Sequence, residues 1–212
     1  MDKRVLWKLS YGLYAIGVSD QGRACGCIVN TVMQVTSDSP AVTVCLNKNN
    51  YTTQLLQKTG VFTVSILSEK TNPATIGALG FASGRDTHKF MDVPFRLVEG
   101  LPVVEDAVCG GMLCRVTSIT DVGTHLLFVG KVVDAFAGET DVPPMTYEYY
   151  HKVVKGSAPK NAPTYRGQEE QTAPSEEPVY VCGVCGYEHQ GELPEDFKCP
   201  ICKQPREVFR KK

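Results

Sequence analysis

Short apolar stretches separated by turn signals dominate the first 155 residues of the chain. Runs rich in Val, Ile, Leu and Thr predict strands over residues 41–46 and 61–67. The tetrapeptide Ser19-Asp20-Gln21-Gly22 is typical of a turn, so we expect a hairpin between strands at 12–18 and 25–35. A second antiparallel pair is predicted over residues 113–119 and 125–136.

Two short helices interrupt this strand pattern. One is predicted from about Thr52 to Lys58, ending at Gly60. The other begins with Asn72 as its N-cap and Pro73 in the first helical position, and ends near Gly80. Many strands with few helices favour a mainly β fold, a closed antiparallel barrel, over a doubly wound sheet.

A change of composition divides the chain. Residues 156–178 contain no Val, Ile, Leu, Met, Phe or Trp and hold four prolines and two Glu-Glu pairs. Such a segment buries too little apolar surface to offset its chain entropy, so we interpret it as a linker. The predicted organisation is a first domain over 1–155, a linker over 156–178 and a second domain over 179–212. The start of the linker, 156–165, is expected to dock on the first domain.

Overall composition sets limits on function. The 212 residues are 42% hydrophobic and 21% charged, with 22 Lys+Arg against 23 Asp+Glu. This balance excludes a strongly basic nucleic-acid binder. The N-terminus has no signal-peptide pattern, and the longest apolar runs are too short to cross a bilayer. We therefore expect a soluble cytoplasmic protein with no nucleic-acid or membrane partner and with cysteines that do not form disulfides.

Four of the nine cysteines form a metal-ligand pattern. Cys182-x-x-Cys185 and Cys199-x-x-Cys202 are separated by 13 residues. Two such loops supply four thiolates in a tetrahedron, which suits zinc or a single iron. A 34-residue domain rarely folds without a metal, disulfides or a partner, so these cysteines are also expected to hold it together. The other five are expected to be apolar core residues of the first domain.

The residues around these loops resemble rubredoxin. The resemblance covers Tyr180-Val181-Cys182-Gly183-Val184-Cys185-Gly186-Tyr187 and Phe197-Lys198-Cys199-Pro200-Ile201-Cys202. Four aromatic residues match the small apolar core of that family: Tyr180, Tyr187, Phe197 and Phe209. The resemblance implies iron rather than zinc, with electrons exchanged near Cys185 and Cys202. The spacing between the loops is shorter than in free-standing rubredoxins and closer to rubredoxin-like modules attached to other proteins.

The first domain lacks the common nucleotide and hydrolase motifs, G-x-G-x-x-G, G-x-x-x-x-G-K-[ST] and G-x-S-x-G. Between Tyr11 and Tyr165 it resembles the flavin reductase-like family of FMN-binding split barrels. The segments that carry this resemblance, in order, are 11–14, 26–31, 38–52, 83–90, 123–126, 150–153 and 162–165. The resemblance implies a homodimer with FMN near the subunit interface.

Candidate flavin ligands follow from the chemistry of FMN. Its phosphate needs hydroxyl, amide and cationic donors, for which the candidates are Thr31, Thr52, Ser83, Arg85 and Lys89. A helix beginning near Thr52 could also direct amides at an anion. The ring system needs donors and acceptors along one edge, for which the candidates are Asn30, Gln34, Asn47, Lys48 and Asn49. Simpler interpretations stay open: Arg85 and Lys89 as a solvated pair, Thr52 as a helix cap, and residues 47–50 as an ordinary loop.

His125 begins a predicted strand after a glycine turn. The family resemblance implies a position close to the flavin and the nicotinamide site, so His125 is the candidate catalytic residue. The alternative is a strand-edge histidine bonded to a neighbouring carbonyl.

Together these parts predict an electron-transfer flavoprotein. NAD(P)H reduces FMN, FMN reduces the one-iron centre, and the small domain passes electrons to a redox partner. The layout resembles the high-molecular-weight rubredoxins, which implies a flavodiiron protein that reduces oxygen or nitric oxide as the partner. The enzyme activity expected is that of an NAD(P)H-dependent flavin oxidoreductase or rubredoxin reductase. Two alternatives remain: a free-flavin reductase with a zinc-ribbon docking domain, and a binding module without redox activity.

Overall fold

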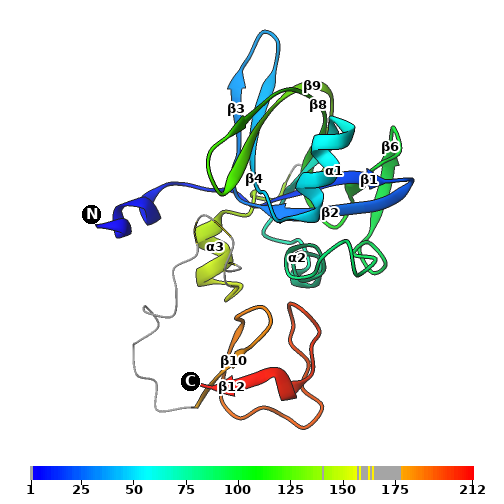
Figure 1. Ribbon diagram of the computed structural model, residues 1–212. Coiled ribbons are helices and arrows are strands. Elements are labelled where there is room, and N and C mark those ends of the chain that lie inside the picture. The colour runs from blue at the N-terminus through cyan, green and yellow to red at the C-terminus, as the bar shows by residue number, and fades with distance from the viewer. Residues whose placement is uncertain (1, 140, 157, 159–161, 163, 165–177) are drawn as a thin grey trace.

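The computed structural model describes residues 2–139, 141–156, 158, 162, 164 and 178–212 (Figure 1). It contains a larger β domain and a small C-terminal domain, which lies beside the helices α2 (Pro73–Gly80) and α3 (Tyr147–Lys152). Most of the predicted linker lies outside the described residues. Thr164, near the start of that linker, is described. Its hydroxyl accepts a hydrogen bond from the Asn30 side chain of the larger domain at 2.9 Å, as expected if the start of the linker docks on this domain.

An antiparallel sheet forms the larger domain. Its strand order is β2-β1-β5-β8-β9-β4-β3, so β2 and β3 are the outer strands of this order. The strands are β1 (Tyr14–Asp20), β2 (Arg23–Val29), β3 (Val32–Thr36), β4 (Ala41–Asn47), β5 (Val61–Leu67), β8 (Val108–Asp121) and β9 (His125–Ala137). The long β8–β9 pair connects the two halves of the sheet. The prediction of a mainly β fold is confirmed.

The predicted first hairpin is confirmed, with one correction at its far end. Asp20 pairs with Arg23, and Gln21 and Gly22 both have positive φ, 52° and 90°, which a tight two-residue hairpin turn requires. The single strand expected over 25–35 is instead two strands, because β2 ends at Val29 and β3 begins at Val32. Between them the chain leaves β1 and reaches β4, where the Thr31 hydroxyl donates to the carbonyl of Cys45.

Both predicted helices are present, and side chains cap them. The Asn72 side chain accepts from the amide of Ala74 at 2.9 Å, as expected for an N-cap. The helix α1 (Tyr51–Thr59) begins one residue earlier than predicted, because Asn50 rather than Thr52 caps it. Gly60 ends α1 in the left-handed conformation, φ 70°, which favours glycine.

Four shorter elements were not predicted. They are the 3-10 helix η1 (Lys3–Lys8), the hairpin of β6 (Phe95–Val98) and β7 (Leu101–Val104), and α3. The strands of the hairpin are four residues long, and β7 contains Pro102, which weakens a strand pattern.

Three hydrophobic clusters form the core. One lies between α1 and the sheet around Phe62 and Phe128, and a second contains Leu79, Met145 and Tyr150. The third belongs to the small domain and surrounds the cysteine loops. Of the five cysteines expected in the core of the larger domain, Cys25, Cys27 and Cys114 are buried. The expectation is wrong for the other two, Cys45 and Cys109, which are only half-buried.

The small domain is a three-stranded sheet with the order β11-β10-β12. Its strands are β10 (Val179–Cys182), β11 (Glu188–Gln190) and β12 (Phe209–Lys211), preceded by the 3-10 helix η2 (Arg206–Val208). The rings of Phe197 and Phe209 meet edge to face at 5.3 Å and form part of its small apolar core.

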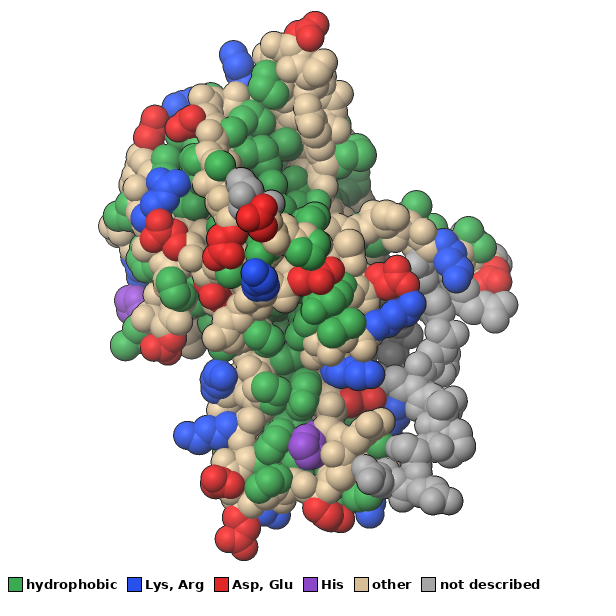
Figure 2. All heavy atoms as spheres, turned by 180° about the vertical axis from the view of Figure 1, so that it is seen from behind, with side chains coloured by type: hydrophobic (Ala, Val, Ile, Leu, Met, Phe, Trp, Pro, Cys, Tyr) green, Lys and Arg blue, Asp and Glu red, His purple; other side chains and the backbone are tan. Residues whose placement is uncertain are grey.

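Acidic and basic side chains are interspersed over the face shown in Figure 2, without a continuous area of one sign. Among the described residues, no helix has the length and apolar character needed to traverse a bilayer.

Candidate functional site

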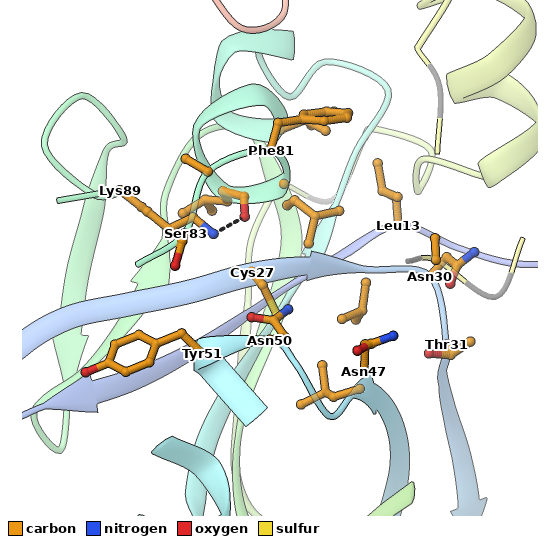
Figure 3. A pocket seen from close by; sticks show the side chains of 18 of the residues that line it. Leu13, Cys27, Asn30, Thr31, Asn47, Asn50, Tyr51, Phe81, Ser83 and Lys89 are labelled. Carbon is orange, nitrogen blue, oxygen red and sulfur yellow. Dashed lines mark hydrogen bonds between the residues drawn. The ribbon is translucent and has the colours of Figure 1, made fainter. Parts of the chain in front are cut away.

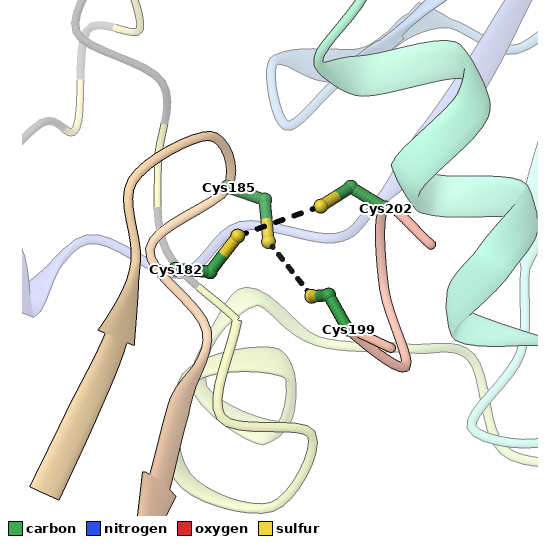
Figure 4. A group of neighbouring side chains, drawn as sticks. All are labelled: Cys182, Cys185, Cys199 and Cys202. Atoms are coloured by element: carbon green, nitrogen blue, oxygen red, sulfur yellow. Dashed lines mark hydrogen bonds between the residues drawn. The ribbon is translucent and has the colours of Figure 1, made fainter. Parts of the chain in front are cut away.

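The four predicted metal ligands converge. One sulfur from each of Cys182, Cys185, Cys199 and Cys202 lies within 4.8 Å of the others (Figure 4). The Sγ atoms of Cys182 and Cys202 are 3.5 Å apart, and those of Cys185 and Cys199 are 3.4 Å apart. Four sulfurs clustered in this way fit a single tetrahedral iron or zinc ion.

Two matching loops bring these sulfurs together. In the first loop the amide of Gly186 donates to the carbonyl of Cys182 at 2.8 Å. In the second the amide of Lys203 donates to the carbonyl of Cys199 at 2.9 Å. Gly186 and Lys203 have positive φ, 73° and 59°, so each loop turns back directly after its second cysteine. This repeated turn is the local reason why the Cys-x-x-Cys spacing presents both thiols on one side.

Hydrogen bonds within the cluster favour the thiolate form of Cys199. The sulfurs of Cys185 and Cys199 share a hydrogen bond, and backbone amides of Cys202 and Ile201 donate to the Cys199 sulfur. The Cys185 thiol, and to a lesser degree these amides, hold the pKa of Cys199 below its ordinary value. Burial has the opposite effect on Cys202 and raises its pKa. A metal ion that displaces the thiol protons would relieve this conflict, so the donor set fits a resident metal.

A pocket of about 440 Å³ opens in the larger domain, in the size range of small-molecule and cofactor sites (Figure 3). Strands β2 and β4, the start of α1 and the segment after α2 contribute its walls. Seven of the predicted flavin-site residues line it: Asn30, Thr31, Asn47, Asn49, Ser83, Lys89 and His125. In Figure 3 Asn30, Thr31 and Asn47 lie toward one end, with Ser83 and Lys89 toward the other.

Hydrogen bonds fix the side chains at the Asn30 end. Asn30 is 7% exposed and its amide donates to the Thr164 hydroxyl at 2.9 Å. That hydroxyl in turn donates to Tyr147 at 2.8 Å. The Asn47 side-chain oxygen accepts from the amide of Asn49 at 2.9 Å. These contacts orient donors and acceptors of the kind that a flavin ring edge needs.

The opposite end holds a buried cation. Lys89 is 6% exposed, and its ammonium donates to the carbonyls of Gly26, at 2.8 Å, and Leu79. Burial lowers the pKa of Lys89. An ammonium group has three N–H donors, so two carbonyl bonds leave one for an anion in the pocket. Ser83 lies nearby in the lining and its hydroxyl accepts from the amide of Arg85 at 3.2 Å.

Four predicted flavin ligands do not line the pocket. Gln34 is exposed on β3 and donates to the carbonyl of Thr36 at 3.0 Å, while Lys48 pairs with Asp121 at 2.6 Å. Thr52 is 1% exposed in the first turn of α1. The exposed Arg85 bonds the side chain of Gln54 at 2.9 Å and lies 5.1 Å from the ring centre of Tyr51. Contacts with neighbouring residues thus account for Gln34, Lys48 and Arg85, and burial in α1 accounts for Thr52.

Other lining residues were not identified from the sequence: Asn50, Tyr51, Phe81, Tyr150 and Val184. Asn50 and Tyr51 adjoin the candidate loop 47–49, so proximity in sequence could have indicated them. Val184 belongs to the first cysteine loop, and no local pattern relates it to a pocket in another domain.

Comparisons with known proteins identify the two parts. Residues 6–156 match the family model described as flavin reductase like domain, and residues 180–210 match the rubrerythrin, rubredoxin-like domain. The chain is 37% identical to a high molecular weight rubredoxin of Moorella thermoacetica, with 99% of each chain covered. It is 39% identical to a ferric-chelate reductase (NAD(P)H) of Archaeoglobus fulgidus over 78% of this chain and 98% of the relative.

A solved structure agrees with the fold. The NADH:FAD oxidoreductase of Streptomyces globisporus C-1027 superposes with a TM-score of 0.62 at 21% identity, covering 68% of this chain and 85% of that one. The likeness supports the fold alone, whereas the matched sequence family and the relative aligned over nearly the whole chain establish descent. The chain therefore belongs to the flavin reductase-like family of oxidoreductases and, with its C-terminal rubredoxin-like domain, has the architecture of a high-molecular-weight rubredoxin.

Proposed function

We propose that the pocket binds FMN, with the phosphate at the end of Ser83 and Lys89 and the ring system against Asn30, Thr31 and Asn47. The buried ammonium group of Lys89 supplies positive charge for the phosphate. The oriented amides at the other end supply complementary donors and acceptors. His125 lines the same pocket, which supports a role beside the flavin and the nicotinamide.

We further propose that the four-cysteine site holds one iron and that electrons pass from NAD(P)H through the flavin to this iron. A flavin accepts a hydride and releases electrons singly, and an iron centre of this kind carries one electron. The observation that carries the proposal is Val184. It lies between two metal ligands in sequence and lines the flavin pocket, so the two centres adjoin.

The small domain would then reduce a separate redox protein, for which a flavodiiron oxygen or nitric oxide reductase is our candidate. The near-complete alignment with a high molecular weight rubredoxin supports a role in electron transfer. None of the nine cysteines, all of which lie in the described part of the chain, forms a disulfide, which supports our proposal of a reducing compartment such as the cytoplasm.

We also propose that the protein is a homodimer. Four exposed apolar side chains on β3, β8 and β9 offer a surface for a second copy: Met33, Val35, Ile119 and Val133. Sedimentation velocity of the purified protein tests this proposal, and a monomer at micromolar concentration would contradict it.

A visible spectrum followed by anaerobic reduction tests the relay. Purified protein should show flavin bands together with ferric-thiolate absorption, and NADH or NADPH should bleach both. Flavin bands with bound zinc and no ferric signal would favour the alternative, a free-flavin reductase with a zinc-ribbon docking domain. Bleaching of the flavin alone in an iron-loaded protein would refute internal transfer, and a colourless protein would refute both redox functions.

A further inference from the structure

The second cysteine loop lies directly against α2. A β-carbon on Gly77 would be 1.9 Å from the carbonyl oxygen of Ile201 and 3.1 Å from the Cα of Cys202. The first distance is far below van der Waals contact and the second is a tight contact. The obstructing atoms are backbone, which cannot move aside as a flexible side chain can. Figure 4 shows α2 beside Cys202. Glycine at position 77 is therefore what allows this close approach.

Side chains extend the contact on both sides of Gly77. Ile201 is 1% exposed, although it occupies the tip of a short loop in a small domain. Phe81, at the end of α2, packs against the metal-site cluster and also lines the flavin pocket. From the first cysteine loop, Val184 reaches the same pocket while remaining 45% exposed. A single layer of apolar side chains thus lies between the pocket and the metal ligands.

Tyr150 completes this layer from α3. It lines the pocket and is 2% exposed, and its hydroxyl has no hydrogen-bond partner among the described residues. Burial raises the pKa of Tyr150, and the thiolates of the metal site, Cys185 foremost, act in the same direction.

We propose that Gly77, Phe81 and Tyr150 form a docking seat for the two cysteine loops, and that electrons pass from the flavin pocket to the metal centre across this seat. The inference rests on the proposed function and specifies the surface on which it depends. One hydride from NADH supplies two electrons, which leave the flavin in two successive one-electron steps. One four-cysteine site accepts one electron at a time, so the second electron follows once a one-electron acceptor, the redox partner, has reoxidised the iron. In balance, NADH and two ferric centres, formed in turn at the same site, give NAD+, two ferrous centres and one proton.

The decisive variant is Gly77→Ala in the full-length protein. Alanine is a better helix former than glycine, so α2 itself should not be weakened. The added methyl group overpacks the contact with Ile201, which should leave about tenfold fewer docked molecules. In anaerobic stopped flow with NADH, we expect flavin bleaching at the wild-type rate and iron bleaching about tenfold slower. Oxidation of dithionite-reduced iron by cytochrome c should be unchanged.

A second variant disrupts the seat from the opposite side. Val184→Asp places a charge against apolar side chains but keeps all four ligands. Because Val184 also lines the pocket, the variant is read by the ratio of the iron-reduction rate to the flavin-reduction rate, which should fall. The matched control is Leu97→Asp on β6. Leu97 is 59% exposed and lines neither the pocket nor the metal cluster, so all three rates should stay at wild-type values. If both variants act through docking, the double variant should be less affected than the product of the single effects predicts.

A readout without redox chemistry separates this inference from the proposed function. In zinc-loaded protein, Gly77→Ala should speed amide hydrogen exchange in α2 and in the loop around Ile201, and leave β11 unchanged. Unchanged exchange there, or an unchanged rate of iron reduction, would overturn the docking seat. Equal slowing of flavin reduction, iron reduction and iron oxidation would also overturn it, because it would indicate general damage to the protein. If NADH never reduces the iron of the wild-type protein, but Gly77→Ala still speeds hydrogen exchange, then the docking seat is supported and the relay is refuted.

Discussion

Asn47 and His125 lie directly opposite each other in the antiparallel ladder of β4 and β9. Asn47 ends its strand and His125 begins its own, and both side chains line the pocket. The amide of Lys48 continues the pairing by donating to the carbonyl of Thr124 at 3.1 Å. Two positions 78 apart in the sequence are thus brought to one wall by strand pairing.

This pairing leads to a prediction for His125. His125→Gln keeps a polar side chain at the pocket wall but removes the imidazole. We expect flavin affinity to stay within about twofold of wild type, while hydride transfer from NADH slows by about tenfold or more. Stopped-flow bleaching of the flavin at saturating NADH measures the rate. An unchanged rate would make His125 a strand-edge residue without a catalytic role.

Variants of Asn30 and Gln34 test whether a candidate ligand must line the pocket to bind the flavin. Both were predicted from the sequence, but only Asn30 lines the pocket. Asn30→Ala removes a buried amide that is oriented by Thr164, and we expect about tenfold weaker FMN binding. Gln34→Ala changes an exposed side chain outside the pocket, so affinity should be unchanged. Fluorescence titration of the apoprotein with FMN measures both. Equal losses would show that the flavin extends to β3.

Variants of Lys89 and Arg85 test which of these two cations binds the FMN phosphate. Lys89→Met should weaken FMN binding by about tenfold more than riboflavin binding, since only FMN carries the phosphate. Arg85→Met should leave this preference intact, because its guanidinium bonds Gln54 and stacks on Tyr51. Comparing both ligands in each variant cancels any general loss of stability. A loss of preference in Arg85→Met alone would move the phosphate out of the Lys89 end.

Cys185→Ser tests the metal site. Three remaining thiolates should hold iron poorly, so we expect loss of the ferric-thiolate absorption and of bound iron, with FMN still bound. Cys109→Ser is the control, because Cys109 is a half-buried free cysteine outside the cluster. Metal analysis together with the visible spectrum gives the answer. Loss of FMN from Cys185→Ser would mean that the larger domain depends on the metal for its folding.

The hydrogen bonds to the Asp20 carboxylate lead to a prediction that the stability of the fold depends on pH. Arg23 and Tyr51 both donate to this carboxylate, at 2.5 and 2.9 Å, and lower its pKa below the ordinary 3.8. Because the folded-state pKa is the lower one, this contribution to stability is present above pH 3.8 and is lost as the pH falls through the lowered pKa. Asp20→Asn should therefore lower the Tm near neutral pH and have no effect in strong acid. Tyr51→Phe should give a smaller loss, and equal losses at all pH values would contradict the linkage.

Local sequence determined the parts that depend on neighbouring residues. The Cys-x-x-Cys loops, the caps Asn72 and Gly60, and the turn at Gly22 follow from short-range geometry, which is why they could be predicted. The same holds for the apolar strands β4 and β5. Sequence also indicated His125 as the candidate catalytic residue, through resemblance to a flavin-binding family, and Asn30 as a candidate flavin ligand, through the chemistry of the flavin ring.

Tertiary structure decided which candidates share a site and how the two domains meet. Arg85 and Lys89 are four residues apart, but only Lys89 turns inward, because carbonyls of β2 and α2 accept its ammonium. The fit of Gly77 to Ile201 depends on an approach of two backbones that are 124 positions apart. Such contacts arise from packing between distant segments, which no local pattern encodes. Sequence alone therefore predicted the residues and chemistry of each proposed centre, and the fold determined that the pocket and the cysteine site adjoin.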